Sequence, residues 1–119
     1  MMTIEPSIET IGIVDIELVG DDYHHMFIKR MDDKHLMVDS TRCFELNQSY
    51  TFRFSLPVVD WIFEAQGVFT MQNEIKGSND EKKFELIILL QNMDAQDQAK
   101  LHEFIQMYNE GKIEIKDIL

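Results

Sequence analysis

The sequence predicts a mainly β domain, a six-stranded antiparallel barrel of the split type with one C-terminal α-helix. Segments in which apolar and polar residues alternate succeed one another along most of the chain, with turn-forming residues between them. Near the C-terminus the apolar period changes to that of a helix. The 119 residues suit a single domain over 1–119 with one hydrophobic core. A barrel followed by a helix accommodates this order of elements.

The predicted strands cover 11–18, 23–30, 35–40, 49–57, 61–75 and 83–91, after a loose lead-in at 1–8. The fourth strand is the clearest, because Phe52 and Phe54 alternate with polar residues. The first is imperfect, because Ile11 and Ile13 fall on the same side as acidic residues. The long fifth strand is expected to bend at Gly67, where a bulge would help the barrel turn a corner. The sixth returns as the closing strand.

A helix is predicted over about 94–110. Its apolar residues follow the spacing i, i+3, i+4 and i+7, and they are Leu101, Phe104, Ile105 and Tyr108. Asp94 is placed to cap the helix, Asp97 lies in the first turn where carboxylates are favoured, and Gly111 is a natural stop. The tail at 112–119 alternates briefly, so a last strand and an extension both remain open.

Charge limits the classes of partner. Eleven basic residues face 22 acidic ones, which gives a net charge of −11. Such a surface repels phosphate-rich ligands at long range, and no basic stripe with interleaved aromatics is present for nucleic acid. Phosphate recognition relies on arginine, and the chain has only Arg30, Arg42 and Arg53. A protein partner with a basic patch is the expected complement.

Catalytic and metal chemistry find no support in the motifs. His24 and His25 are adjacent on a predicted strand, so they point to opposite faces and cannot bind one metal ion together. The pair Asp32 and Asp33 is interpreted as a solvated turn between two strands. No nucleophile motif, metal-ligand spacing or phosphate-cradling glycine loop occurs. We therefore expect no enzyme, no metal and no cofactor.

The single cysteine, Cys43, fits a reducing compartment, and we expect a cytoplasmic protein. The N-terminal residues show neither a basic nor an apolar region of a signal peptide. No apolar run approaches the length of a membrane span, so membrane insertion is not expected.

Several motifs in a fixed order resemble a known family. They are S-x-x-x-F at Ser40–Phe44, the Leu56–Pro57 end of an aromatic strand, and D-x-x-D-x-x-x-L-x-x-F-I at Asp94–Ile105. Over roughly 23–108 the chain resembles a PilZ domain. This bacterial family forms a six-stranded antiparallel barrel with a C-terminal helix, and its ligand is cyclic di-GMP.

The motifs that hold this ligand in the family are missing from the chain. One is Arg-x-x-x-Arg ahead of the barrel, whereas residues 1–29 contain no arginine. The other, Asp/Asn-x-Ser-x-x-Gly, aligns with 30–35, where Arg30, Asp32 and His35 stand at the signature positions. The resemblance therefore implies a divergent member in which cyclic di-GMP is not expected.

The resulting hypothesis is a non-catalytic PilZ-like module that binds a protein partner in bacterial signalling or surface motility. The alternative is a small-molecule receptor that binds cyclic di-GMP through unconventional residues. It would draw on Lys29, Arg30, Arg42 or Arg53, of which Arg30 and Arg42 are the better candidates because both lie near turns. The sequence leaves monomer and homodimer open.

Overall fold

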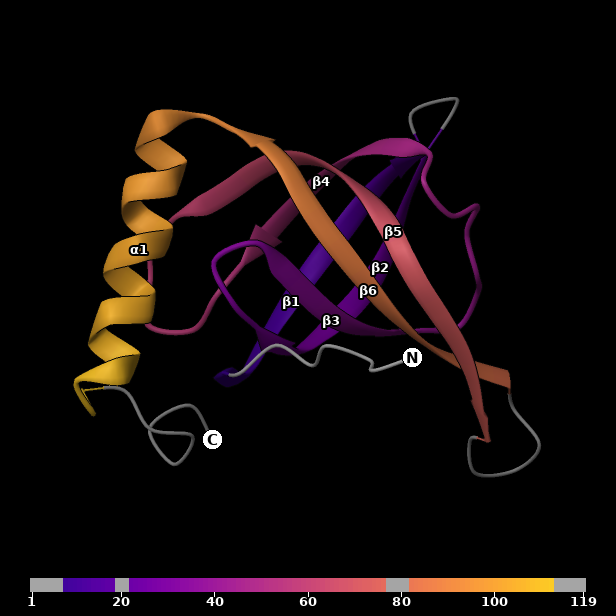
Figure 1. Cartoon of the computed structure of the whole chain (residues 1–119), viewed down its shortest axis with the longest axis horizontal. Coiled ribbons are helices and arrows are strands. Elements are labelled where there is room, and N and C mark those ends of the chain that lie inside the picture. Colours follow the sequence, from indigo (N-terminus) through magenta and orange to yellow (C-terminus); the bar gives the residue numbers. More distant parts are fainter. Residues whose placement is uncertain (1–7, 19–21, 77–81, 113–119) are drawn as a thin grey trace.

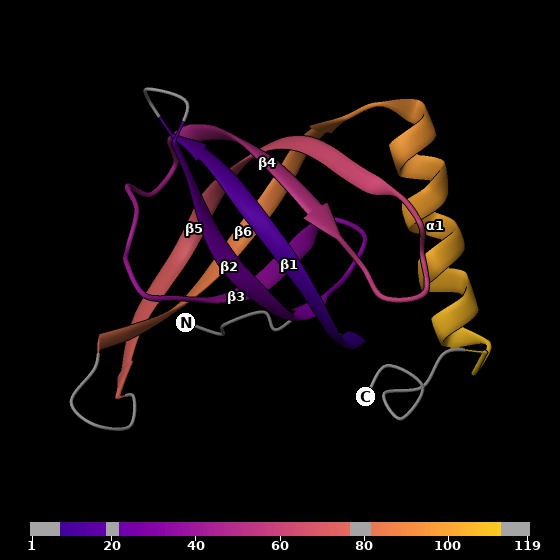
Figure 2. The same cartoon turned by 180° about the vertical axis from the view of Figure 1, so that it is seen from behind.

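The computed structural model describes residues 8–18, 22–76 and 82–112. Six strands precede one helix, and the elements are β1 (Ile8–Leu18), β2 (Asp22–Met31), β3 (His35–Ser40), β4 (Ser49–Ser55), β5 (Ile62–Lys76), β6 (Lys82–Met93) and α1 (Ala95–Asn109). The strands form a closed antiparallel barrel, and α1 stands beside it (Figures 1 and 2). The predicted fold, a six-stranded antiparallel barrel with a C-terminal helix, is confirmed.

The strand order around the barrel is β1-β2-β3-β6-β5-β4. It consists of two meanders, β1–β2–β3 and β4–β5–β6, in which strands consecutive in the chain pair with each other. Two seams join the meanders. One pairs β3 with β6, for example Val38 with Leu86, and the other pairs β1 with β4, for example Val14 with Phe54.

One expectation about the strands is confirmed and one is corrected. The sixth strand was expected to close the barrel, and β6, the last strand in the chain, pairs with β5 and joins the second meander to β3 of the first. Ile8, assigned to the loose lead-in, is the first residue of β1; it is buried and pairs with Met31. The lead-in at 1–7 and the tail at 113–119 lie outside the described residues.

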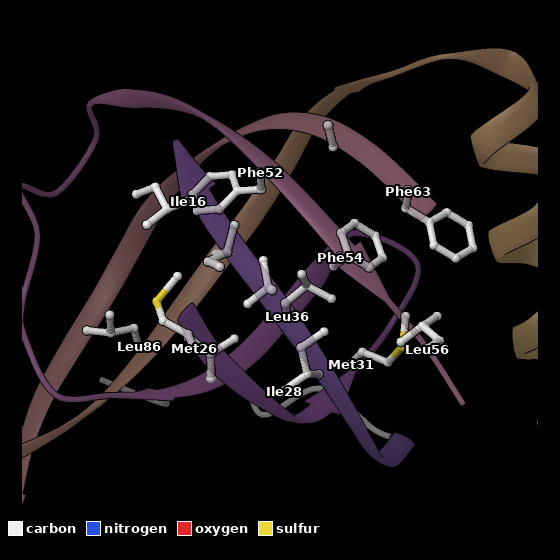
Figure 3. Close-up of a cluster of buried hydrophobic side chains, with 14 of the residues drawn as sticks. Ile16, Met26, Ile28, Met31, Leu36, Phe52, Phe54, Leu56, Phe63 and Leu86 are labelled. Atoms are coloured by element: carbon white, nitrogen blue, oxygen red, sulfur yellow. The ribbon is translucent and has the colours of Figure 1, made fainter. Parts of the chain in front are cut away.

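The barrel interior is filled by the inward residues of all six strands. Phe52, Phe54, Phe63 and Phe69 are fully buried, and the rings of Phe54 and Phe63 stack with centroids 4.9 Å apart. Figure 3 shows aliphatic side chains such as Ile16 and Leu36 in the same interior. Burying each of these side chains contributes about 1.5–3 kcal/mol, so the alternation that predicted the strands also builds the core.

Bulges and glycines shape the barrel. The register between β5 and β6 shifts at Gln66/Gly67, so the bulge predicted at Gly67 is present. A Cβ on Gly67 would lie 2.6 Å from the carbonyl oxygen of Leu89. A Cβ on Gly12 would lie 2.7 Å from the carbonyl oxygen of Ser55, at the seam between β1 and β4. Both positions therefore require glycine because another backbone approaches closely.

The helix α1 packs on the barrel through Leu101 and Phe104, which are buried. Asp94 stands at the N-cap position, but its side chain makes no capping hydrogen bond, contrary to expectation. Gly111 ends the helix with φ of 73° and donates a backbone hydrogen bond to Tyr108. In the part of the chain that the structure describes, no helix is long and apolar enough to cross a membrane.

Candidate functional site

Arg30 lies near the C-terminal end of β2, on the outside of the barrel. Its Nη1 is 3.2 Å from Oε1 of Glu9 on β1, and the two residues are also partners in the strand register. On its other edge β2 pairs with β3. The β2–β3 register shifts between Ile28 and Arg30, and Arg30 pairs with Met37 of β3. The guanidinium is therefore engaged by a carboxylate of the neighbouring strand.

Arg42 lies in the loop after β3, where Ser40 holds its backbone. The hydroxyl of Ser40 accepts a hydrogen bond from the amide of Arg42 (3.1 Å) and donates one to the Arg42 carbonyl (2.7 Å). The guanidinium stands over the ring of Phe44, 4.9 Å from its centroid. Phe44 in turn stacks on Phe69 with centroids 4.9 Å apart, so the cation rests on the aromatic end of the core.

The structure does not bring the two candidate arginines together. Arg30 pairs with Met37 near the start of β3, whereas Arg42 follows the last residue of that strand. A phosphate clamp needs cationic groups that converge on one anion. Arg30 and Arg42 instead lie toward opposite ends of β3, each with its own contacts.

The other two cations considered also face carboxylates. Lys29 pairs with Asp39 at 3.1 Å and with Glu85. Burial alone would lower the pKa of Lys29, but hydrogen bonds and charges from Glu85 and Asp39 outweigh it and raise that pKa above 10.5. Arg53 lies 3.7 Å from Glu64 across the β4–β5 pairing. Lys29 and Arg53 therefore each form ion pairs with carboxylates on the barrel surface.

The turn between β2 and β3 is built by Asp32. Its Oδ1 accepts hydrogen bonds from the backbone amides of Lys34 (2.8 Å) and His35 (2.7 Å). This is the local side-chain pattern that favours Asp in turns, and it agrees with the interpretation of Asp32 and Asp33 as a turn. Asp32 therefore has a structural task at the position that aligns with the family's serine.

A small polar cluster lies beside Arg42. His24 Nε2 is 3.2 Å from the hydroxyl of Ser40, and its ring contacts Phe44 with centroids 5.6 Å apart. Burial lowers the pKa of His24, and the nearby charges of Arg42 and His25 lower it further. His25 points elsewhere, to Asp15 of β1, so the adjacent histidines do not share a site. Among the described residues, no three His, Cys, Asp or Glu side chains gather as metal ligands would.

Sequence reasoning missed an exposed apolar surface on the outside of the barrel. We name it the outer patch, and it consists of Ile11, Ile13, Phe27 and Ile62. Two of its members, Ile11 and Ile13, gave the only advance signal, because they broke the alternation of the first predicted strand on the polar side. Their relation to Phe27 and Ile62 depends on strand register, which a local pattern does not reveal.

The fold is shared with solved structures at low sequence identity. The inhibitor of motility from Bacillus subtilis (MotI/DgrA) aligns with a TM-score of 0.69 at 14% identity, over 95% of this chain and 53% of its own. MrkH from K. pneumonia gives 0.70 at 10% identity, over 92% of this chain and 49% of its own. The PilZ domain of YcgR from Escherichia coli, solved with c-di-GMP, gives 0.64 at 9% identity, over 98% and 95%.

These similarities establish the architecture of the chain, a PilZ-like barrel with a C-terminal helix. The chain spans about half the length of MotI/DgrA and of MrkH, and nearly all of the YcgR domain. No protein-family model matches the sequence, and no curated protein matches it by sequence. The likeness therefore concerns the fold alone.

Proposed function

We propose that this chain is a non-catalytic PilZ-like module that binds a protein partner in bacterial signalling or surface motility and does not bind cyclic di-GMP. We further propose that it works in the cytoplasm. The observation that carries the proposal is the dispersal of its candidate cations. Lys29, Arg30 and Arg53 each face a carboxylate, and Arg42 lies beyond the far end of β3.

The physical argument rests on what a doubly charged dinucleotide would need. Two phosphates require guanidinium or ammonium groups that converge and that are not already neutralised. Releasing Arg30 from Glu9, or Lys29 from Asp39 and Glu85, would leave carboxylates facing the ligand. The net charge of −11 adds a long-range repulsion. Both terms oppose an anionic ligand and favour a partner that carries positive charge.

The setting in signalling or motility rests on fold analogy. One similar protein is described as an inhibitor of motility, and another is a PilZ domain solved with c-di-GMP. One fold hosts many functions, so these descriptions guide only the proposed setting. The chemistry of the candidate site decides between a module that binds a protein and a receptor for cyclic di-GMP. That chemistry favours the module that binds a protein and does not bind cyclic di-GMP.

Isothermal titration with cyclic di-GMP at low salt tests the proposal, because low salt strengthens weak phosphate contacts. With protein at about 100 μM, we expect no heat of binding, which sets the affinity weaker than roughly millimolar, or about −4 kcal/mol. One-to-one binding that the double substitution Arg30→Ala and Arg42→Ala abolishes would overturn the proposal in favour of an unconventional nucleotide receptor. Binding that survives the double substitution would also overturn it and would direct attention to Lys29 and Arg53.

A further inference from the structure

The outer patch follows one transverse line across the barrel. In the register, Phe27 of β2 pairs with Ile13 of β1, and Ile13 pairs with Ser55 of β4. Ser55 pairs in turn with Ile62 of β5, so these four residues are successive neighbours on the outer face. Ile11 lies two residues from Ile13 and shares its face.

These side chains are unusually exposed for their type. Phe27 is 62% exposed, Ile62 67%, Ile13 48% and Ile11 42%. The outward face of an antiparallel sheet normally carries polar residues, and neighbouring outward positions of β1 indeed hold Asp15 and Glu9. Single exposed apolar side chains are ordinary, but apolar neighbours gathered on one face mark an interaction site.

The described elements leave this face open. Figure 2 shows β1 on the near side of the barrel, with α1 standing to one side. The helix is tied to the barrel at the Ile62 end of the row, through the hydrogen bond from Trp61 to Asp97, and Ile62 itself stays 67% exposed. The apolar row on β1 and β2 therefore lacks a cover among the described elements.

Carboxylates outnumber cations around the outer patch. Beside the row lies a second line of paired residues, His25–Asp15–Arg53–Glu64, and Phe27 itself pairs with Asp39. The ion pairs of this region contain three Lys or Arg side chains and five carboxylates, which are Lys29, Arg30, Arg53, Glu9, Asp15, Asp39, Glu64 and Glu85. Each cation is paired within the chain, so the surplus is negative.

We propose that the outer patch docks a protein partner whose apolar contact surface is bordered by lysine or arginine. This inference rests on the proposed function and names its docking surface. Burial of the apolar row supplies affinity, Phe27 is its aromatic side chain, and the acidic border steers a basic partner. A second copy of this chain is the weaker occupant, because two acidic borders and two charges of −11 would repel.

The test is an NMR titration of isotopically labelled full-length chain with a short amphipathic helical peptide of leucine and lysine. We expect amide shifts concentrated at 11–15, 25–29 and 62–64, and affinity that falls with added salt. Phe27→Ser should weaken binding at least about tenfold. The matched control is Leu46→Ser, which removes an exposed apolar side chain outside the outer patch. Leu46 is 39% exposed, and its replacement should leave binding unchanged. A leucine and glutamate peptide should not bind.

Each contrary result has its own meaning. Shifts that spread over other acidic surfaces, or equal effects of Phe27→Ser and Leu46→Ser, would overturn the docking surface. A dimer in sedimentation that Phe27→Ser dissociates would overturn it in favour of a second copy. Because Phe27 is exposed, we expect Phe27→Ser to remain folded, and a dispersed NMR spectrum of this variant checks that it does. A silent cyclic di-GMP titration alongside a failed peptide test leaves the proposed function standing and removes only the surface, whereas nucleotide binding removes the function itself.

Discussion

The indole Nε1 of Trp61 donates a hydrogen bond of 2.7 Å to Oδ1 of Asp97, which joins the segment ahead of β5 to the first turn of α1. The other carboxylate oxygen accepts a hydrogen bond of 3.3 Å from the backbone amide of Glu64. Asp97 is 8% exposed, so one buried carboxylate fastens the helix to the barrel at two points.

Replacing this carboxylate should loosen the helix. Asp97→Ala leaves the indole and an amide without partners, and we expect a loss of about 1–3 kcal/mol in the free energy of unfolding. Asp97→Asn keeps an oxygen for Trp61 and should cost less. Denaturant unfolding measures both, and Trp61, the only tryptophan, reports the contact by its fluorescence. Equal stability of Asp97→Ala and wild type would show that the two bonds contribute nothing net.

Gly67 should not tolerate a side chain. Gly67→Ala places a Cβ 2.6 Å from the backbone oxygen of Leu89, so the β5–β6 bulge must shift. We expect destabilisation of about 1–3 kcal/mol, the range for forced local strain. Gln66→Ala changes the neighbouring exposed position and serves as the control in thermal or denaturant unfolding. A wild-type stability for Gly67→Ala would mean that the bulge relaxes freely.

The loop between β4 and β5 holds a strained residue. Val58 has φ of 70°, a left-handed conformation that a β-branched residue rarely adopts, and its side chain is 68% exposed. Val58→Gly relieves the strain at the cost of added freedom in the unfolded chain, and we expect a net gain of about 1 kcal/mol. Unfolding curves in denaturant decide the sign. A loss of stability would indicate that the valine side chain packs usefully against the loop.

Acid should weaken the fold partly through His24. Burial, then Arg42 and His25, hold its pKa below the ordinary 6.5, so the folded state binds this proton less readily than the unfolded state. The destabilising effect of His24 is absent above pH 6.5. The free energy of unfolding falls as the pH drops through 6.5 towards the lowered pKa of His24 in the folded state. His24→Gln should therefore lose less stability than wild type between pH 8 and pH 5.

His102→Gln, which removes another imidazole ring at an exposed position of α1, is the matched control for this measurement. Denaturant unfolding of the three proteins at both pH values gives the comparison. Identical slopes for His24→Gln and wild type would show that His24 titrates alike in the folded and unfolded states.

The local pattern of apolar residues was sufficient to identify the strands and the helix. It was insufficient to predict how the strands pair in the barrel. Alternation around Phe52 and Phe54 predicted β4, and the stripe through Leu101 and Phe104 predicted α1, because these periods follow from the element itself. The place of β6 in the barrel depends on pairing with residues distant in sequence, which the same pattern does not encode. The strand and its hairpin neighbour β5 were therefore identified, and its pairing with β3 was not.

The candidate site divides in the same way. Arg30 and Arg42 were chosen as cations near turns, and their positions on β2 and after β3 agree with that choice. The contact of Arg30 with Glu9 depends on the β1–β2 register, so a local pattern could not indicate that a carboxylate faces Arg30. Asp97 looked like an ordinary first-turn carboxylate, because its bond to Trp61 arises only when α1 meets the barrel.

The two seams of the barrel have a consequence for the speed of folding. Each three-stranded meander brings together neighbours in the chain, but β3 meets β6, and β1 meets β4, only after long segments are enclosed. Enclosing a long segment costs entropy before its contacts form, so such topologies fold in roughly milliseconds to seconds. We expect the meanders to form early and the seam contacts, Val14 with Phe54 and Val38 with Leu86, to belong to the late, slow step.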